Sequence, residues 1–208
     1  PLSRVSSWLA GTRLLSLPFS TVCSPLLEYP EDLDLLLQVA LDGLDEENGT
    51  YLEIRTSPGF EWTAMERMAV DRTFKSHELD LTPGIDQVKS SFHRRSIRPC
   101  IHRAERSNLR CEPSEKEEDI DLFYGVYRLT RKRLGLPPMP LEFFQNLWKY
   151  LYPEQMELLV ARDGRQVAGA IILLKYRAQG SAEMSGWDRR FDSERPEHHL
   201  LAKAISPP

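Results

Sequence analysis

The chain has 208 residues, 41% of them hydrophobic, which is enough to bury the core of one large domain or of two small ones. Its formal net charge of -4 at pH 7 provides no overall attraction to nucleic acid or to an anionic membrane, so any such binding must depend on local charge. The longest apolar run is far shorter than the roughly 20 residues that span a bilayer. We therefore expect a cytoplasmic protein with no integral membrane segment.

The cysteines do not predict a disulfide framework or a metal site. Cys23, Cys100 and Cys111 are an odd set without regular spacing, which favours reduced thiols. His93 and His102 lie near two of them, but the resulting H-x6-C-x-H-x8-C spacing matches no familiar zinc pattern. We expect no bound metal.

The first part of the chain predicts a strand–helix–strand unit within a loop-rich region. Leu14–Phe19 is expected to form a short strand. A helix is expected to begin at Pro30–Asp32, because proline suits the first turn and acidic groups favour the positive end of the helix dipole. Asn48-Gly49 should end this helix, and Tyr51–Thr56 should form the second strand. Phe74–Leu81 alternates enough to predict a further strand.

A basic segment follows, in which a helix is expected over residues 85–108. Arginine suits bidentate contacts to phosphate, so Arg94, Arg98 and Arg103 are candidate ligands for a charged tRNA, a nucleotide-linked lipid or a pyrophosphate. The alternative is a surface helix with basic faces. Pro99 should kink or interrupt this helix, because proline removes a backbone donor and crowds the preceding turn.

The C-terminal part predicts an antiparallel meander with helices on its faces. Its strands are expected at Glu157–Arg162, Gln166–Tyr176 and Ser181–Trp187, and Asp163-Gly164 suits a type I′ hairpin turn between the first two. The middle strand is a near-continuous apolar run, which implies burial on both faces. Helices are expected before the meander, over residues 122–134 and 141–150, and after it from Pro196.

From Asp119 onward, the expected order is helix, helix, strand, hairpin, strand, strand, loop, helix, which is the order of the N-acetyltransferase (GNAT) fold. Three stretches resemble the second domain of FemAB-like acyltransferases: TRKRLGLPPMPLEFFQNL, LLVARDGRQVAGAIILL and SGWDRRFDSERPEHHLLAKAI. Upstream, LPFSTVCSPLL, TYLEIR and HELDLTPGIDQVKSSFHRRSIRPCIHRAERSNL look like the end of the first domain and the helix that joins it to the second.

This resemblance implies an α/β (α+β) fold, with a mixed, mainly antiparallel sheet, flanking helices and parts of two tandem GNAT-like domains. Residues 1–83 would be the end of the first domain, 84–108 a basic connecting helix, and 109–208 a second domain without its final strands. On this interpretation the chain is truncated at both ends. Two features depart from the family: Pro99 interrupts a helix that is usually continuous, and the loop before the last helix lacks a glycine-rich pyrophosphate cradle.

The resemblance also implies an N-acyltransferase of the peptidoglycan-bridge or exopolysaccharide-associated type. The enzyme would transfer an activated acyl or aminoacyl group, from acyl-CoA or aminoacyl-tRNA, to an amine on a cell-envelope or exopolysaccharide precursor. Such chemistry needs a base for the amine proton and donors for the oxyanion. In this fold the reaction centre lies where the central strands splay, at the end of Ser181–Trp187.

Glu183 and Asp188 are the candidate catalytic carboxylates at that strand end. Alternation along the strand would place Glu183 on one face with Ser181, Ser185 and Trp187. Each carboxylate has an ordinary alternative, a solvated strand residue for the first and a loop cap for the second.

Trp187, Arg189 and His198 complete the residues expected to bind substrate, although a histidine in a first helical turn is more often a surface or capping residue. Two other interpretations of the whole chain stay open. One is a non-catalytic module whose basic helix holds an anionic, phosphate-bearing partner, and the other is an inactive fragment.

Overall fold

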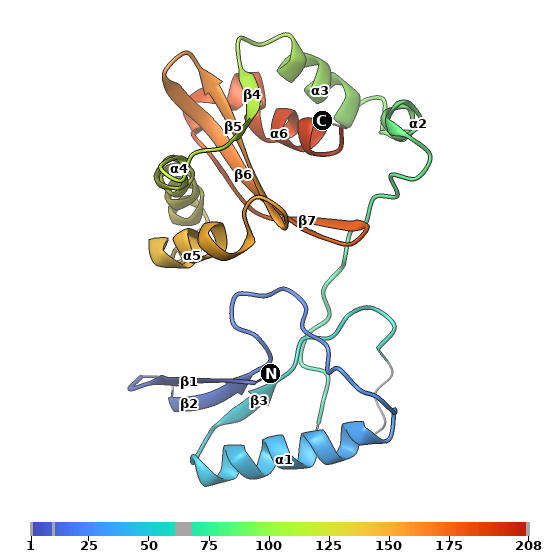
Figure 1. The fold of residues 1–208 in the computed structure, drawn as a ribbon, viewed down its shortest axis with the longest axis vertical. Helices are drawn as coiled ribbons and strands as arrows, with labels where there is room; N and C mark the ends of the chain where they lie inside the picture. Colours follow the sequence, from blue (N-terminus) through green and yellow to red (C-terminus); the bar gives the residue numbers. More distant parts are fainter. Residues whose placement is uncertain (1, 10, 61–67, 207–208) are drawn as a thin grey trace. The chain divides into compact units, whose positions relative to one another are not determined.

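The computed structural model describes residues 2–9, 11–60 and 68–206, and describes the backbone but not the side chain of Glu183 (Figure 1). The chain divides into two compact units, Pro1–Glu78 and Leu79–Pro208. Among the described residues, no helix has both the length and the apolar character needed to cross a bilayer.

The first unit is a small sheet with one helix. Its elements are β1 (Ser3–Ser7), β2 (Gly11–Leu15), α1 (Asp32–Glu46) and β3 (Tyr51–Glu53). β1 pairs antiparallel with β2, and β2 pairs parallel with β3, so α1 is the crossover of the predicted strand–helix–strand unit. The buried side of α1 consists of leucine and alanine at helical spacing: Leu33, Leu37, Ala40, Leu41 and Leu44.

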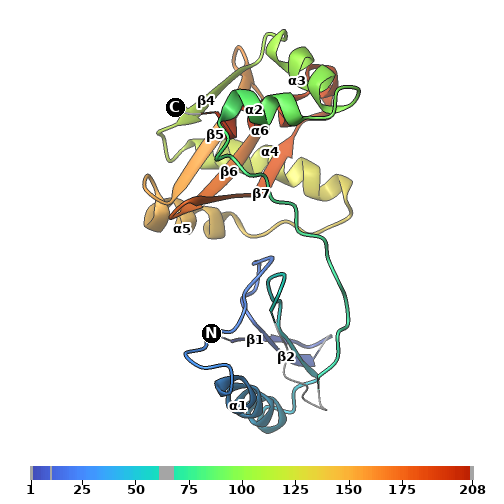
Figure 2. The same cartoon turned by 90° about the vertical axis from the view of Figure 1, so that its right-hand side faces the viewer.

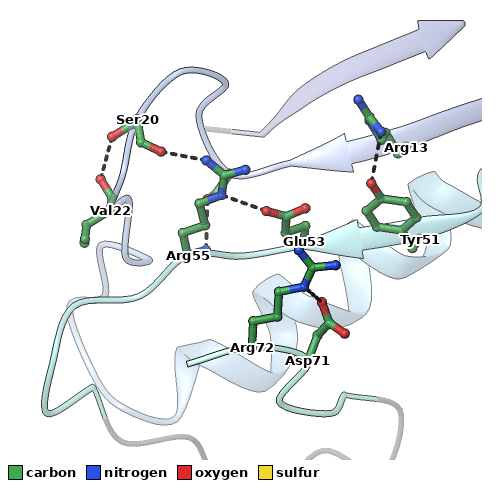
Figure 3. Close-up of polar contacts among 9 residues, drawn as sticks. Arg13, Ser20, Val22, Tyr51, Glu53, Arg55, Asp71 and Arg72 are labelled. Carbon is green, nitrogen blue, oxygen red and sulfur yellow. Dashed lines mark hydrogen bonds and ion pairs between the residues drawn. The ribbon is translucent and has the colours of Figure 1, made fainter. Parts of the chain in front are cut away.

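Arg55 ties the irregular segment after β2 to the segment that leaves β3 (Figure 3). Its guanidinium donates to the Ser20 carbonyl at 2.9 Å and to Glu53 Oε1 at 2.7 Å. Its backbone N–H donates to Ser16 Oγ at 3.1 Å. The connection between β2 and α1 is therefore anchored by polar contacts, although it forms no regular element.

Three strand predictions in this unit need correction. The strand expected at Leu14–Phe19 lies earlier, at Gly11–Leu15, and β1 was not predicted. The strand expected at Tyr51–Thr56 ends at Glu53, and Phe74–Leu81 forms no strand. Residues 74–81 are exposed. The alternation of apolar and polar residues was not enough to predict a strand there, because a strand also needs a neighbouring strand with which to exchange hydrogen bonds.

The second unit is a four-stranded antiparallel sheet in the order β4-β5-β6-β7, which confirms the predicted meander. In chain order its elements are α2 (Ile85–Ser91), α3 (Ile97–Glu105), β4 (Arg110–Ser114), α4 (Asp119–Arg133), α5 (Leu141–Leu151), β5 (Met156–Asp163), β6 (Gln166–Tyr176), β7 (Gln179–Trp187), the 3₁₀ helix η1 (Arg189–Glu194) and α6 (Pro196–Ala204).

Helices cover both faces of this sheet (Figures 1 and 2). On one face, α4 and α5 pack on alternate strand residues, and Phe123 and Phe144 are fully buried there. On the other face, Leu200 of α6 packs against the intervening residues, which include Leu159 and Ile171. The apolar run of β6 is thus buried on both faces, as predicted.

The helix expected over residues 85–108 is interrupted, as Pro99 predicted, but the break lies before the proline: Phe92–Ser96 separate α2 from α3. A continuous helix would place Pro99 in its interior, where proline removes a backbone hydrogen bond and clashes with the preceding turn. Because α3 begins at Ile97, Pro99 lies in a first turn, where no intrahelical donor is needed.

The turn between β5 and β6 lies one residue later in the sequence than predicted. Asp163 pairs with Gln166, so the loop residues are Gly164 and Arg165 rather than Asp163-Gly164. Of these two, only Gly164 has a positive φ, at 56°. That pattern belongs to a type II′ turn, with glycine at the first central position, and not to the predicted type I′ turn.

Gly186 allows β7 to lie directly against the backbone of α4. A Cβ at this position would lie 2.5 Å from the Tyr127 backbone nitrogen and 2.6 Å from its Cα. Backbone cannot move aside as a flexible side chain can, so we expect Gly186→Ala to destabilise the protein by roughly 1–3 kcal/mol. Urea unfolding of the purified chain measures this loss.

The control is Gly125→Ala. Gly125 lies inside α4 with nothing within 4 Å of its added Cβ, so this change should stabilise the protein by about 1 kcal/mol through helix propensity. Equal effects of the two substitutions would contradict the close contact at Gly186.

Candidate functional site

Two hydrogen bonds donated by backbone N–H groups hold the end of β7 in place. The Trp187 N–H donates to Thr130 Oγ1 of α4 at 3.1 Å, and the Asp188 N–H donates to the Ala168 carbonyl of β6 at 2.9 Å. The two acceptor residues belong to the buried core, since Thr130 and Ala168 have little or no solvent-exposed surface. The residues at the strand end are therefore positioned by the core.

The Trp187 indole is fixed at its nitrogen and on one face. Its Nε1–H donates to Asp192 Oδ1 at 2.9 Å, and Oδ2 of the same carboxylate lies 3.4 Å from Arg189 Nε. The guanidinium carbon of Arg133 lies 4.0 Å from the centre of the indole ring. Trp187 and Arg189, both predicted to bind substrate, are thus joined through Asp192, and Arg133 is an addition that sequence reasoning missed.

Asp188 caps η1 and binds Arg190. Its carboxylate accepts from the Arg190 backbone N–H at 2.9 Å and from the guanidinium at 2.7 Å, and its side chain is only 14% exposed. The hydrogen bond from the Arg190 side chain is the largest cause that lowers the pKa of Asp188 below its ordinary value, against the opposing effect of burial. A carboxylate held in this way is a weak base, so the capping interpretation fits the geometry better than the catalytic one.

A small cavity of about 60 Å³ adjoins Trp187 between β7 and α6. Ala182, Ser185 and Trp187 of β7 line it, together with Glu197 and Leu201 of α6. β7 pairs only with β6 among the described strands, so its other edge has backbone groups free of sheet pairing beside the cavity. An extended ligand chain can form hydrogen bonds with backbone groups along such an edge.

The predicted shared face of Ser181, Glu183, Ser185 and Trp187 needs correction at its beginning. The pairing of β6 with β7 shifts register between Ile172 and Leu174, so β7 has one extra residue there. Alternation is interrupted, and Ser181 is out of phase with Ser185 and Trp187. The side chain of Glu183 lies outside the described part of the structure.

The basic residues predicted to bind phosphate are not gathered at this site. Arg98 donates to the Ser90 and Phe92 carbonyls at the end of α2, which is a structural use of its guanidinium. Arg94, between α2 and α3, and Arg103 of α3 are exposed. Within the described ranges, none of the three makes a polar contact with Trp187, Asp188 or Arg189.

The histidine pair at the start of α6 is divided between surface and interior. His198 is partly exposed, whereas the Nδ1 atom of His199 is buried without a hydrogen-bond partner. Burial lowers the pKa of His199, and the nearby Glu105 carboxylate opposes this effect only in part. For the described residues, no group of three or more His, Cys, Asp or Glu side chains is arranged to hold a metal ion.

A second, larger groove of about 1280 Å³ follows β4 at the opposite edge of the sheet. Its lining includes Asp119, whose carboxylate accepts from Arg162 at 2.9 Å and from Ser114 at 2.6 Å. Pro113 lies in the edge strand and cannot donate to an added strand. The end of β7 is the better candidate for a site, because its fixed aromatic ring, cations and cavity lie together.

Comparison with known proteins gives two findings. Residues 91–206 match the model of the acetyltransferase (GNAT) domain family. Among solved structures, the chain is similar to the crystal structure of FemX, with a TM-score of 0.54 and 13% sequence identity over 59% of this chain and 46% of that one. The chain therefore spans about half the length of the structure it matches. No curated protein matches the sequence.

Because Asp188 caps η1, removing its side-chain acceptor should lower the stability of the folded protein. We expect Asp188→Ala to lower the free energy of unfolding by about 1 kcal/mol, and Asp188→Asn by much less, because asparagine still accepts from the Arg190 N–H. Urea unfolding measures both, and equal losses would contradict the cap.

This stability difference should also depend on pH. The folded-state pKa of Asp188 lies below its ordinary value of 3.8, so its contribution is complete above that pH and is lost as the pH falls through the folded-state pKa. The difference in the free energy of unfolding between the unsubstituted protein and Asp188→Ala should thus be constant from neutral pH down to 3.8 and should decrease below that pH.

Cys111 should be unreactive in the folded protein. Burial raises the pKa of this thiol from 9.0 to about 12, so very little thiolate is present at neutral pH. We expect alkylation of Cys111 by iodoacetamide, followed by peptide mass spectrometry, to be slow in buffer and fast in urea. Rapid native alkylation at Cys111 would contradict its burial.

Proposed function

The chain belongs to the acetyltransferase (GNAT) domain family, and we propose that it transfers an activated acyl or aminoacyl group to an amine. The proposed acceptor is a cell-envelope or exopolysaccharide precursor, a class that rests on the resemblance to FemAB-like acyltransferases. We also propose that residues 1–83 belong to a first GNAT-like domain and 109–208 to a second, joined by residues 84–108.

The observation that carries this proposal is the arrangement at the end of β7. Trp187 is fixed by Thr130 and Asp192, and it lies beside a cavity on β7, a strand that pairs with only β6 among the described strands. Backbone N–H and C=O groups along the other edge of such a strand can bind an extended chain without any change in the fold. A donor that lies along β7 would present its acyl carbon to an amine at the cavity.

Two donors remain in the proposal, acyl-CoA and aminoacyl-tRNA. The family membership favours acyl-CoA. The loop after β7 offers arginines, Arg189, Arg190 and Arg195, in place of glycines, and this composition suits phosphate groups of either donor. Because acyl-CoA and charged tRNA are cytoplasmic molecules, we place the reaction in the cytoplasm.

Glu183 is the carboxylate that we propose as general base for the amine proton. Its sequence position in β7 and the weak basicity of Asp188 both favour it. Asp188 would act indirectly, since its capping contact orders the loop that follows Trp187. We also propose His198 as a residue at the rim of the substrate site.

The experiment offers acyl-CoA and charged tRNA in parallel, with a mixture of amine acceptors, and measures CoA thiol release and transfer of a labelled aminoacyl group. We expect turnover with one donor and a loss of roughly 10²–10⁴-fold in kcat for Glu183→Gln, the usual contribution of a general base. Glu154→Gln is the matched control, because Glu154 is an exposed loop carboxylate outside β7.

A different result would favour a non-catalytic module. In that case neither donor would turn over, and an anionic partner such as tRNA would bind in a salt-dependent way. Charge reversal at Arg94 and Arg103, which are exposed, would abolish that binding, whereas Glu183→Gln would leave it unchanged.

A further inference from the structure

Arg133 is held over Trp187 with most of its hydrogen-bonding capacity unused. Arg133 is the last residue of α4, and its side chain is partly buried. Its guanidinium carbon lies 4.0 Å from the centre of the indole ring. A guanidinium has five N–H donors in one plane, so stacking one face on a ring leaves those donors free. In the part of the chain that the structure describes, its only hydrogen bond is a long one, 3.5 Å to Thr130 Oγ1.

The aspartates at the end of β7 and in η1 already have basic partners. The Asp188 carboxylate binds Arg190, and Asp192 binds both the Trp187 indole and Arg189. Among the described residues, Arg133 forms no ion pair. Arg133 is therefore a cation held over the indole with no ion-pair partner in the described part of the chain.

The surroundings are basic, although the whole chain is acidic. Residues 131–133 and 188–195 together contain six basic and three acidic side chains, whereas the whole chain has 27 basic and 31 acidic ones. The end of α4 contributes a partial negative charge of roughly half a unit, which the three basic residues of its last turn outweigh. Local charge at Trp187 thus favours an anion.

We infer that Arg133, stacked on Trp187, is an anion-binding subsite for a phosphate group of the substrate. Its planar fork can bind two oxygens of one phosphate at once, and the indole keeps that fork in a single orientation. Arg189 contacts the same Asp192 carboxylate that accepts from the Trp187 indole, so a second guanidinium lies near this ring. The subsite is distinct from the basic segment at Arg94–Arg103.

This inference rests on the proposed function for its substrate, because both donors and nucleotide-linked acceptors contain phosphate. The phosphate would come from the donor if it belongs to CoA, and from the acceptor if it belongs to a nucleotide-linked precursor. In either case Arg133 positions the ligand by a charge-assisted hydrogen bond and takes no part in proton transfer.

The test measures binding of inorganic pyrophosphate by isothermal titration calorimetry, with no acyl transfer involved. We expect Arg133→Gln to weaken pyrophosphate binding by roughly tenfold or more, the effect of losing a charge-assisted hydrogen bond. Arg133→Lys should have an intermediate effect, since it keeps the charge but not the planar fork.

Arg128→Gln is the matched control. Arg128 is an exposed residue of the same helix, 5.9 Å from the ring centre of Tyr124, so this change removes an equal charge from a similar arrangement away from Trp187. Its pyrophosphate affinity should match that of the unsubstituted protein. Thermal unfolding of all variants shows whether the fold is retained.

Titrations with CoA and with UDP then identify the source of the phosphate. A loss of CoA affinity in Arg133→Gln supports a donor-side subsite, and a loss of UDP affinity supports an acceptor-side one. The inference is overturned if the unsubstituted protein does not bind pyrophosphate, or if Arg133→Gln binds it as well as Arg128→Gln does. Acyl transfer that persists in either case would leave the proposed function intact.

Discussion

The close contact between β7 and α4 is the constraint on which the candidate site depends. Gly186 lacks a Cβ, so the strand approaches the helix backbone near Tyr127 closely enough for the next residue to bind Thr130. That hydrogen bond places Trp187 at the strand end, where Arg133 can cover its ring. The site is therefore a consequence of core packing, because both partners of the contact belong to the buried layer between helix and sheet.

Electrostatics then divides the polar residues of the site into two groups. Asp188 and Asp192 neutralise Arg190 and Arg189 and in doing so order the loop after β7. Arg133 has no such partner among the described residues, and it is the cation whose charge is available to a ligand. Exposed pairs such as Asp192–Arg189 add little to stability, so their main effect is to fix the position of the indole.

Part of the candidate site could be predicted from sequence. Trp187 and Arg189 follow directly from their place after the third strand of the meander, and the structure joins them through Asp192. For Asp188 the sequence left a base and a loop cap open, and it could not decide between them, because the pKa of this carboxylate depends on a guanidinium two residues away whose direction only the 3₁₀ helix sets. Arg98 shows the same limit: a basic residue that suited a phosphate caps a neighbouring helix instead.

By itself, the sequence determined the meander, its two-sided burial and the family resemblance, because each depends on residues near one another in the chain: the apolar run of β6, the hairpin glycine and the motifs after Trp187. Only the tertiary structure decided which distant residues meet. Arg133 and Thr130 contact Trp187 because α4 packs across the sheet. No local sequence pattern predicts a contact between residues so far apart in the chain. For residues 85–108, Pro99 alone predicted an interruption, but only the structure showed that the break lies before the proline, at Phe92–Ser96.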